Sequence, residues 1–422
     1  MKRLLLILVL LSALIPSAAY ADGDWNELRY EEPVTLSLLL DPNQAQPSDF
    51  DEVIELIEEK LNIVTEIYLR PSGNYVKSLL AMGDMTDLCV YNSGSLFKAL
   101  NPDVYFADLS NESFAKRIDE AFTQSVSVSG GLYGIPLSTS YVGGWLYNKD
   151  IHEQLGLDEP RTWEELMANC EAISQAGILP VIGGYKDGWS SQIVLLADYH
   201  NLVHEYPNFA DDYNARRAGF SSTPAALRGF EKLYELHEKA YLNADANEIS
   251  HKDACRMFAE GKAAYLPSLS NSLPLIEEAN PDKINRIGVF GQPGDDVNHQ
   301  GITVWLPSGI YLSNTSQNIE AAKRWMTFYL SDEGLNAFAA GNKLTGPYVI
   351  DNVKSNRSNY TCIDSLSRYS EQNSAVPALE FSSALKGTNL SQITQECAAG
   401  LITPKAAAQL YDQDVERGAL IG

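Results

Sequence analysis

Aromatic side chains beside glycine are the residues of this sequence whose types best suit a defined chemistry. The chain has 22 tyrosines, 13 phenylalanines and 6 tryptophans. An aromatic face can stack on the apolar C–H face of a sugar ring, while Asp, Asn and Ser oxygens bind the hydroxyl groups. The aromatic residues in glycine-containing loops are Tyr141, Trp145, Tyr185, Trp189 and Trp305. Packing in a core or a hinge is the alternative role for each of them.

Motifs for phosphate binding and nucleophilic catalysis are absent from the sequence, which has no G-x-x-x-x-G-K-[ST] and no G-x-S-x-G. His200 and His204 can share one helix face, but Asn201 occupies the place of the glutamate that a zinc-protease helix needs. The segment 41–52 has the length of a calcium loop, but alanine and glutamine replace a ligand and a glycine at its centre. We therefore expect no metal and no cofactor.

The five cysteines are Cys89, Cys170, Cys255, Cys362 and Cys397. Their wide spacing, without any C-x-x-C, argues against a zinc ribbon and against dithiol redox chemistry. An odd number leaves at least one thiol unpaired, and buried thiols behave as small apolar side chains. The spacing leaves open whether Cys362 and Cys397 form a disulfide.

The composition is that of a packed acidic protein. Apolar residues make up 45% and charged residues 20%, which excludes a wholly disordered chain. The formal net charge is −24, from 55 acidic and 31 basic side chains. Non-specific nucleic-acid binding needs clustered Lys and Arg, so we expect no nucleic-acid partner. An anionic membrane surface would repel the chain for the same reason.

Residues 1–21 have the three parts of an export signal. Lys2 and Arg3 form a basic start, Leu4–Leu11 is an apolar run, and Ala19–Ala21 has the small-x-small pattern of a cleavage site. The apolar run is too short to span a membrane, which takes about 20 residues. We predict a secreted protein of the periplasm or the extracellular cell surface.

Short apolar runs alternate with helical patterns after this signal. Strands are predicted at 34–40, 63–69 and 88–91, with helices at 50–61 and 75–82 between them. Such alternation is typical of βαβ units and of a largely parallel sheet.

Two later segments have clear local signals. Thr162 and Glu165 have the spacing of a capping box, and Gly177 is suited to end the helix that follows it. The loosely alternating segment 302–312 predicts one strand, and Pro404 begins a final helix.

Five motifs, in order, resemble the extracellular solute-binding proteins of ABC importers, in the maltose-binding-like sugar family (family 1). The longest of them is Tyr133–Pro180, which contains YGIP, LYNKD, LGL, PRTWEEL and AGILP. The others are GDMTDL at 83–88, GKAAYL at 261–266, SQNIEAAKRWMTFYLSDEGLNAF at 316–338 and AAGLITPKAAAQL at 398–410. The resemblance extends through nearly all of the chain after the signal.

The resemblance implies an α/β, two-lobed periplasmic-binding-protein fold (type II), in which each lobe is a central sheet flanked by helices. The implied N-terminal lobe is 22–142 plus 303–344, and the implied C-terminal lobe is 143–302 plus 345–422. The implied function is that of a receptor, not an enzyme. It captures a mono- or short oligosaccharide in the cleft between the lobes by a hinge motion. As a monomer, it then delivers the sugar to the membrane subunits of an ABC transporter.

Carried over by position, the implied ligand-binding residues are Asp41, Asn43, Ser93, Tyr141, Trp145, Trp189, Asn271 and Trp305. Asn271 stands where relatives often carry a tryptophan that stacks on a sugar. This departure favours a ligand that is smaller or more polar than a long malto-oligosaccharide.

Two other functions stay open at this point. A receptor of the same fold could bind iron, a polyamine or thiamine, and the many tyrosines suit ferric iron. A secreted glycoside hydrolase would need two cleft carboxylates about 5–9.5 Å apart, which could lie among the 55 acidic residues. The fold alone does not separate these ligands.

Overall fold

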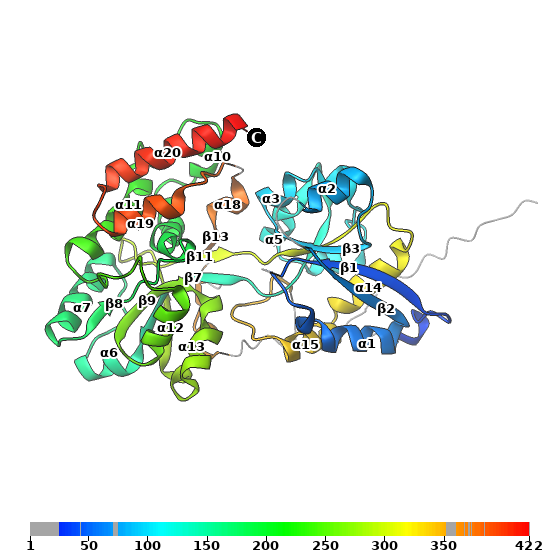
Figure 1. The fold of residues 1–422 in the computed structure, drawn as a ribbon, viewed down its shortest axis with the longest axis horizontal. Helices are drawn as coiled ribbons and strands as arrows, with labels where there is room; N and C mark the ends of the chain where they lie inside the picture. The colour runs from blue at the N-terminus through cyan, green and yellow to red at the C-terminus, as the bar shows by residue number, and fades with distance from the viewer. Residues whose placement is uncertain are drawn as a thin grey trace, which may run out of the picture.

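The strands of the protein form two main sheets, and the chain passes between them. The computed structural model describes residues 25–42, 44–70, 75–351, 360–366, 368–369, 372, 374–383 and 385–421. Within these residues, one sheet has the order β2-β1-β3-β12-β6, and the other has the order β13-β11-β7-β9-β8 with β10 also paired to β7. Each sheet is the centre of one lobe (Figure 1), and we call them the N-terminal and the C-terminal lobe.

The N-terminal lobe begins with the predicted alternation of strands and helices. Its strands are β1 (Val34–Leu40), β2 (Ile63–Leu69), β3 (Leu88–Tyr91), β6 (Gly134–Pro136) and β12 (Gly309–Leu312). Its main helices are α1 (Asp51–Leu61), α2 (Tyr75–Met82), α3 (Ser95–Lys98), α5 (Glu120–Ser125), α14 (Ile319–Tyr329) and α15 (Asp332–Gly341). The first three predicted strands are confirmed, and the helix predicted from residue 50 begins one residue later.

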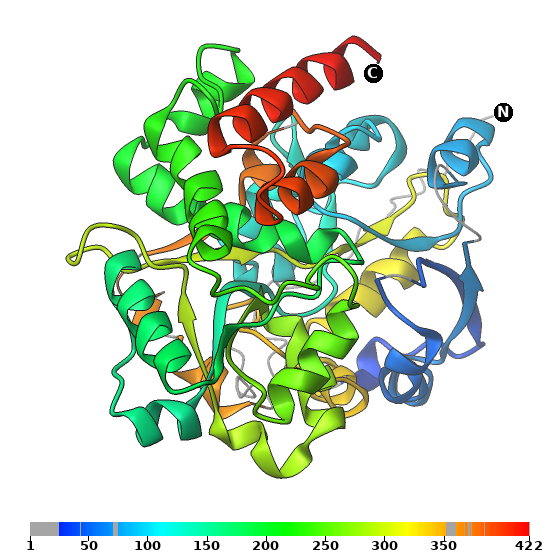
Figure 2. The same ribbon diagram turned by 60° about the vertical axis from the view of Figure 1, so that its left-hand side comes forward.

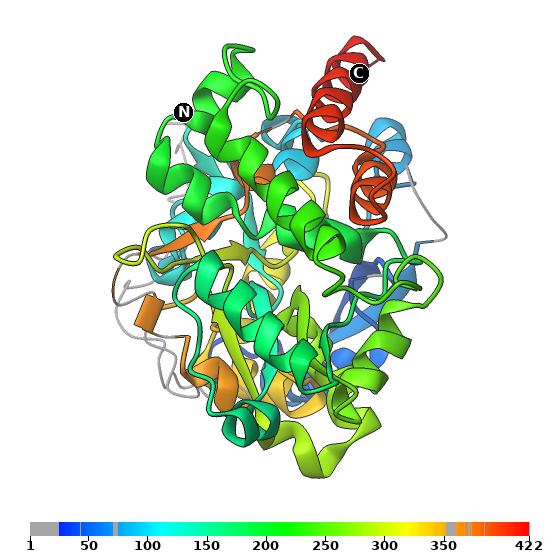
Figure 3. The ribbon, with the colours of Figure 1, turned by 90° about the vertical axis from the view of Figure 1, so that its left-hand side faces the viewer.

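The C-terminal lobe has helices on both faces of its sheet (Figures 2 and 3). Its strands are β7 (Tyr141–Asn148), β8 (Leu179–Val181), β9 (Ala263–Leu269), β10 (Ile287–Gly291), β11 (Ile302–Trp305) and β13 (Ala375–Pro377). Residues of α7 (Trp163–Gln175), α11 (Pro224–Glu238), α19 (Leu390–Ala398) and α20 (Pro404–Ile421) share one apolar core. Residues of α12 (His251–Ala259) and α13 (Leu273–Ala279) share another.

The capping box predicted before α7 is present in part. The Thr162 hydroxyl accepts the backbone N–H of Glu165 at 3.2 Å. The Glu165 carboxylate reaches back one residue further than predicted and accepts the N–H of Arg161 at 2.7 Å. The first contact satisfies one of the backbone donors that the first turn of a helix leaves without partners, and the second satisfies the N–H of the residue before the N-cap.

The chain passes from one sheet to the other at 137–140, after β6, and returns at 306–308, before β12. The single strand predicted over 302–312 is therefore wrong. Pro307 lies at the break, where a residue without a backbone N–H cannot continue a ladder. A third passage follows Ile350, which bridges the N-terminal lobe, and precedes α16 (Thr361–Asp364), which packs on β10. The residues at which the sequence places the lobe boundaries stay a prediction.

The predicted largely parallel arrangement holds only for part of each sheet. β1 pairs in parallel with β2 and β3, but β12 pairs antiparallel with β3 and β6. In the other sheet, β7 is antiparallel to β9, β10 and β11. β7 and β12 are antiparallel to their neighbours because the chain crosses between the lobes just before each of them. Each strand therefore enters its sheet at the end where the parallel strands finish, and it runs in the opposite direction. Both sheets are therefore mixed.

All five cysteines are free and buried, including Cys362 and Cys397, whose pairing the sequence left open. Among the described residues, no helix is both long enough and apolar enough to cross a membrane. The predicted export signal lies outside the described residues.

Candidate functional site

Polar residues follow the strands of the N-terminal sheet at one edge. Asp41 follows β1, Arg70 follows β2 and Ser93 follows β3. The register aligns these strand ends, because Leu40 pairs with Leu69, and Tyr91 pairs with the first residue of β12. The chain leaves for the other lobe from this same edge, so these side chains lie on the side that faces the C-terminal lobe.

Two aromatic residues stand opposite each other at the facing edge of the C-terminal sheet. Tyr141 begins β7 and Trp305 ends β11, and the two are direct cross-strand partners. Leu269, the last residue of β9, pairs with Gly143 at the same edge. Cross-strand partners point to the same face of a sheet, so Tyr141 and Trp305 are neighbours beside two of the passages between lobes.

The Trp305 ring packs directly against Gly143. A Cβ on Gly143 would overlap the Trp305 ring, so only glycine leaves room for the indole to lie over β7. Tyr141 is half-buried, and burial raises the pKa of its phenol, with a further contribution from Asp49 of the N-terminal lobe. The phenol therefore stays protonated at neutral pH and can both donate and accept a hydrogen bond.

A buried ion pair lies at the N-terminal edge. Arg70 and Asp41 form a salt bridge, with only 8% and 6% of their side chains exposed. The Arg70 guanidinium also lies 5.4 Å from the centre of the Tyr91 ring. Its Nε and Nη1 are buried and have no hydrogen-bond partner within the described part of the chain. Arg70 was missed by the sequence reasoning, although a lone basic residue directly after an apolar strand is a signal that could have found it.

The other predicted N-terminal residues have different positions. The Ser93 hydroxyl donates to the Pro307 carbonyl at 2.8 Å, so it holds one passage between lobes against the N-terminal edge. Asn43 lies outside the described residues.

Trp189 and the residue after Asn271 both contact a buried histidine, His251. The Trp189 ring is 4.6 Å from the ring of His251, and 37% of Trp189 is exposed. His251 Nε2 lies 2.8 Å from the Ser272 hydroxyl, which is adjacent in sequence to the exposed Asn271. Burial lowers the pKa of His251 to about 4, so this histidine is neutral at pH 7. One side chain thus joins two loops that the sequence assigned to ligand binding.

Trp145 has a different environment from the other predicted aromatic residues. It is fully buried, packs at 6.0 Å against both Trp163 and Tyr265, and donates its indole N–H to Gln292 at 2.6 Å. Its ring supports the sheet beneath the site and presents no face to a ligand in this structure.

The two histidines with helical spacing belong to a cluster with His299. His200 Nε2 donates to the Gln292 carbonyl at 2.9 Å, so its Nδ1 accepts from His299 Nε2 at 3.2 Å. Burial lowers the pKa of His200 to about 3, which keeps it neutral. His204 stacks on His299 at 3.8 Å. No group of three or more His, Cys, Asp or Glu side chains in the described ranges is placed to hold a metal ion.

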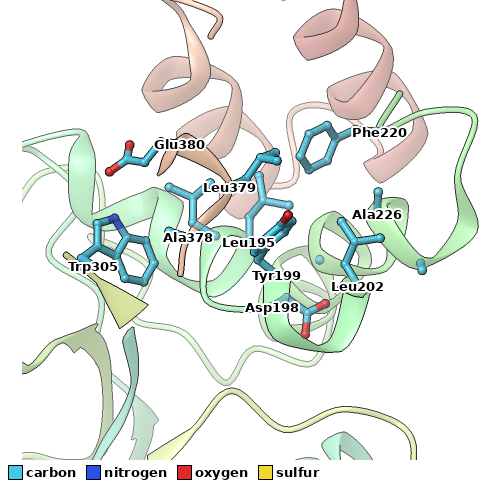
Figure 4. A pocket seen from close by; sticks show the side chains of 13 residues that line it. Leu195, Asp198, Tyr199, Leu202, Phe220, Ala226, Trp305, Ala378, Leu379 and Glu380 are labelled. Atoms are coloured by element: carbon cyan, nitrogen blue, oxygen red, sulfur yellow. The ribbon is translucent and has the colours of Figure 1, made fainter. Parts of the chain in front are cut away.

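A pocket in the C-terminal lobe has Trp305 in its wall (Figure 4). Its volume is about 40 Å³, and it lies between α8 (Ile193–Leu196), α9 (Tyr199–Glu205), α11 and α18 (Leu379–Ser382). Trp305 is the one predicted site residue in its wall. The sequence carried no signal for this pocket, because α18 is a single short turn whose position depends on the rest of the fold.

Comparison with known sequences identifies a family for this chain. The family model of bacterial extracellular solute-binding proteins matches residues 88–335. A multiple sugar-binding protein of Streptococcus mutans is 25% identical over 304 residues, which cover 69% of this chain and 68% of that protein.

Solved structures of the same fold cover nearly the whole chain. A chitin oligosaccharide binding protein aligns with a TM-score of 0.73 and 19% identity, over 91% of this chain and 98% of the other. A sugar transporter protein from Bacillus licheniformis, solved in complex with stachyose, aligns with a TM-score of 0.68 and 21% identity, over 91% and 100% of the two chains.

Proposed function

Because this chain belongs to the bacterial extracellular solute-binding proteins, we propose that it captures a carbohydrate between its lobes and delivers it to the membrane subunits of an ABC transporter. The ligand is a mono- or short oligosaccharide. The observation that carries the proposal is the pair Tyr141 and Trp305, which stand side by side where the C-terminal sheet faces the polar strand ends of the other lobe. A sugar ring fits between an aromatic face and hydrogen-bonding groups of this kind.

The ion pair at the N-terminal edge of the site favours a neutral ligand. Asp41 and Arg70 compensate each other, so a polyamine finds no spare carboxylate in this pair and an anion finds no spare cation. The remaining guanidinium N–H groups suit hydroxyl and ring oxygens, which are acceptors without charge. The names of the relatives, a multiple sugar-binding protein and a stachyose complex, support the same class of ligand.

The work of such a receptor is binding coupled to closure, without bond breaking. A ligand that contacts both lobes favours the closed arrangement by its higher affinity for that arrangement. The passages at 137–140 and 306–308 are the segments that would rotate, and the bond from Ser93 to Pro307 ties one of them to the N-terminal lobe. The closed lobes would then form the surface that the membrane subunits recognise. Export through cleavage after Ala21 is part of the proposal, and N-terminal sequencing of the secreted protein tests it.

Calorimetry against a panel of mono- and oligosaccharides tests the proposal. Trp305→Ala and Tyr141→Ala should each weaken the best sugar at least tenfold, because loss of an aromatic contact at a binding surface costs about 1–3 kcal/mol. Tyr30→Ala is the matched control, since Tyr30 precedes β1 at the end opposite Asp41, where its ring packs against the Arg324 guanidinium. Binding of spermidine, thiamine or ferric iron with no sugar bound at millimolar concentration would overturn the carbohydrate assignment.

A further inference from the structure

The pocket beside Trp305 reaches from the interlobe edge into the C-terminal lobe. In Figure 4, Trp305 and Glu380 lie at one end of the pocket, and Phe220 and Ala226 lie at the other. The first end adjoins the N-terminal lobe, because the Glu380 carbonyl oxygen lies 3.3 Å from the point that a Cβ on Gly94 would occupy. A sugar stacked on Trp305 would therefore have this pocket next to it.

The wall of the pocket is mostly hydrocarbon. Leu195, Leu202, Phe220 and Leu379 are among the apolar residues that line it. Asp198 also lines it, but its Oδ1 already accepts from the Lys232 ammonium group at 2.6 Å. A wall of this kind favours an apolar group over ordered water.

Two further polar groups in the wall are the Tyr199 phenol and the Glu380 carboxylate. Burial raises the pKa of the Tyr199 phenol to about 12, so Tyr199 offers an O–H donor. The half-exposed Glu380 carboxylate, 3.7 Å from the Lys386 ammonium group, offers an acceptor. The pocket thus offers a phenol donor and a carboxylate acceptor beside an apolar interior.

The volume sets the size of the occupant. A cavity needs roughly 10–15 Å³ to hold one water, so about 40 Å³ takes a group of about three non-hydrogen atoms. An aromatic aglycone is too large for it. A bare methyl group would leave the Tyr199 hydroxyl without a partner, which costs binding free energy.

We infer that this pocket receives the acetyl group of an N-acetylated sugar whose ring lies on Trp305. The acetyl methyl lies against Leu195 and Leu379, the carbonyl accepts from the Tyr199 hydroxyl, and the amide N–H donates to the Glu380 carboxylate. This inference rests on the proposed carbohydrate function and narrows it to the class of N-acetylhexosamines.

Calorimetry with N,N′-diacetylchitobiose and cellobiose tests it, because the two disaccharides differ only in their acetamido and hydroxyl groups. We expect the acetylated sugar to bind at least tenfold more tightly. In Tyr199→Phe the ratio of the two affinities should fall about 3- to 10-fold, as expected for the loss of one hydrogen bond. Ala226→Val adds two carbons to the pocket and should abolish the preference. Ala259→Val, at a buried alanine of α12 in the other core, is the matched control and should keep it.

The possible outcomes distinguish a failure of the acetyl pocket from a failure of the proposed sugar-receptor function. Equal affinities for the two disaccharides, or a preference that survives Ala226→Val, would overturn the acetyl pocket and leave the sugar receptor standing. The same holds if diacetylchitobiose fails to bind while another sugar of the panel binds. If no sugar binds, both proposals fall. Circular dichroism melting checks each variant, and Leu379→Phe, at a half-buried position, fills the pocket from α18 if Ala226→Val does not fold.

Discussion

The buried ion pair between Lys232 and Asp198 should make the C-terminal lobe strongly sensitive to one substitution. Only 1% of the Lys232 side chain and 5% of the Asp198 side chain are exposed. Lys232 Nζ donates to Asp198 Oδ1 at 2.6 Å and to the Pro293 carbonyl at 2.8 Å. Within the described residues, the other donor to the Asp198 carboxylate is the Asn201 amide at 2.7 Å. Removing the ammonium group therefore leaves a carboxylate buried with its charge unpaired.

Lys232→Met should lower the free energy of unfolding by about 3–5 kcal/mol, the cost of breaking a buried pair from one side. With about 2–4 °C per kcal/mol for a unit of this size, the melting temperature should fall by roughly 6–20 °C. Adding Asp198→Asn removes the stranded charge and keeps the side-chain shape. The double variant should therefore be more stable than Lys232→Met alone, with a coupling free energy of about 1–3 kcal/mol.

Urea denaturation followed by circular dichroism measures these differences. Arg228→Met is the control, because Arg228 lies one turn earlier on α11 and pairs with Asp295 at 2.8 Å with 28% of its side chain exposed. Its loss should cost less than about 1 kcal/mol, as for surface pairs. A cost below 1 kcal/mol for Lys232→Met, or a double variant as unstable as the sum of the two single variants, would refute the reasoning.

Three further predictions follow from burial and backbone conformation. Because the pKa values of His200 and His251 are lowered to about 3 and about 4, the unfolded chain binds more protons below pH 6.5. Stability should therefore fall as the pH falls from about 6.5 to 4, by on the order of 3 kcal/mol for His251. In urea titrations at pH 7.5 and 4.5, His251→Gln should reduce this loss, and an unchanged loss would contradict the assignment. Gly94→Ala should destabilise the protein more than Gly83→Ala, because both have φ near +70° but only Gly94 has Phe381 within 2.9 Å of the added Cβ. Thermal melting of the two variants compares them, and equal shifts would exclude a role for the contact with α18. The buried cysteines should react with a thiol reagent only on unfolding, so labelling of the native protein within minutes would contradict their burial.

Much of the secondary structure could be predicted from the sequence, because its causes are local. The apolar runs at 34–40 and 63–69 are strands, and Thr162 caps α7 by its hydroxyl. The two-lobed fold was predicted differently, through the resemblance to a known family that five motifs carry. Each motif is a run of residues near one another in the chain, but their order extends over most of it.

The break in the predicted strand at 302–312 was missed for a physical reason. β11 and β12 have similar apolar patterns, but they pair with strands that are distant in the chain and belong to different sheets. A local pattern records that a residue is buried and not which partner buries it. The antiparallel entry of β7 and β12 has the same origin, because it depends on where the chain passes between lobes.

Sequence by itself determined which residue types were available for binding, and the tertiary structure decided what each of them contacts. Trp145 and Trp305 are both tryptophans of strands in one sheet, yet Trp145 is enclosed by Trp163 and Tyr265, while Trp305 lies over Gly143 at the interlobe edge. The pairing of Asp41 with Arg70, and the pocket closed by the single turn α18, likewise join distant parts of the chain. Burial and partner choice depend on packing over the whole fold, and so they follow from the arrangement of the sheets and not from spacing along the chain.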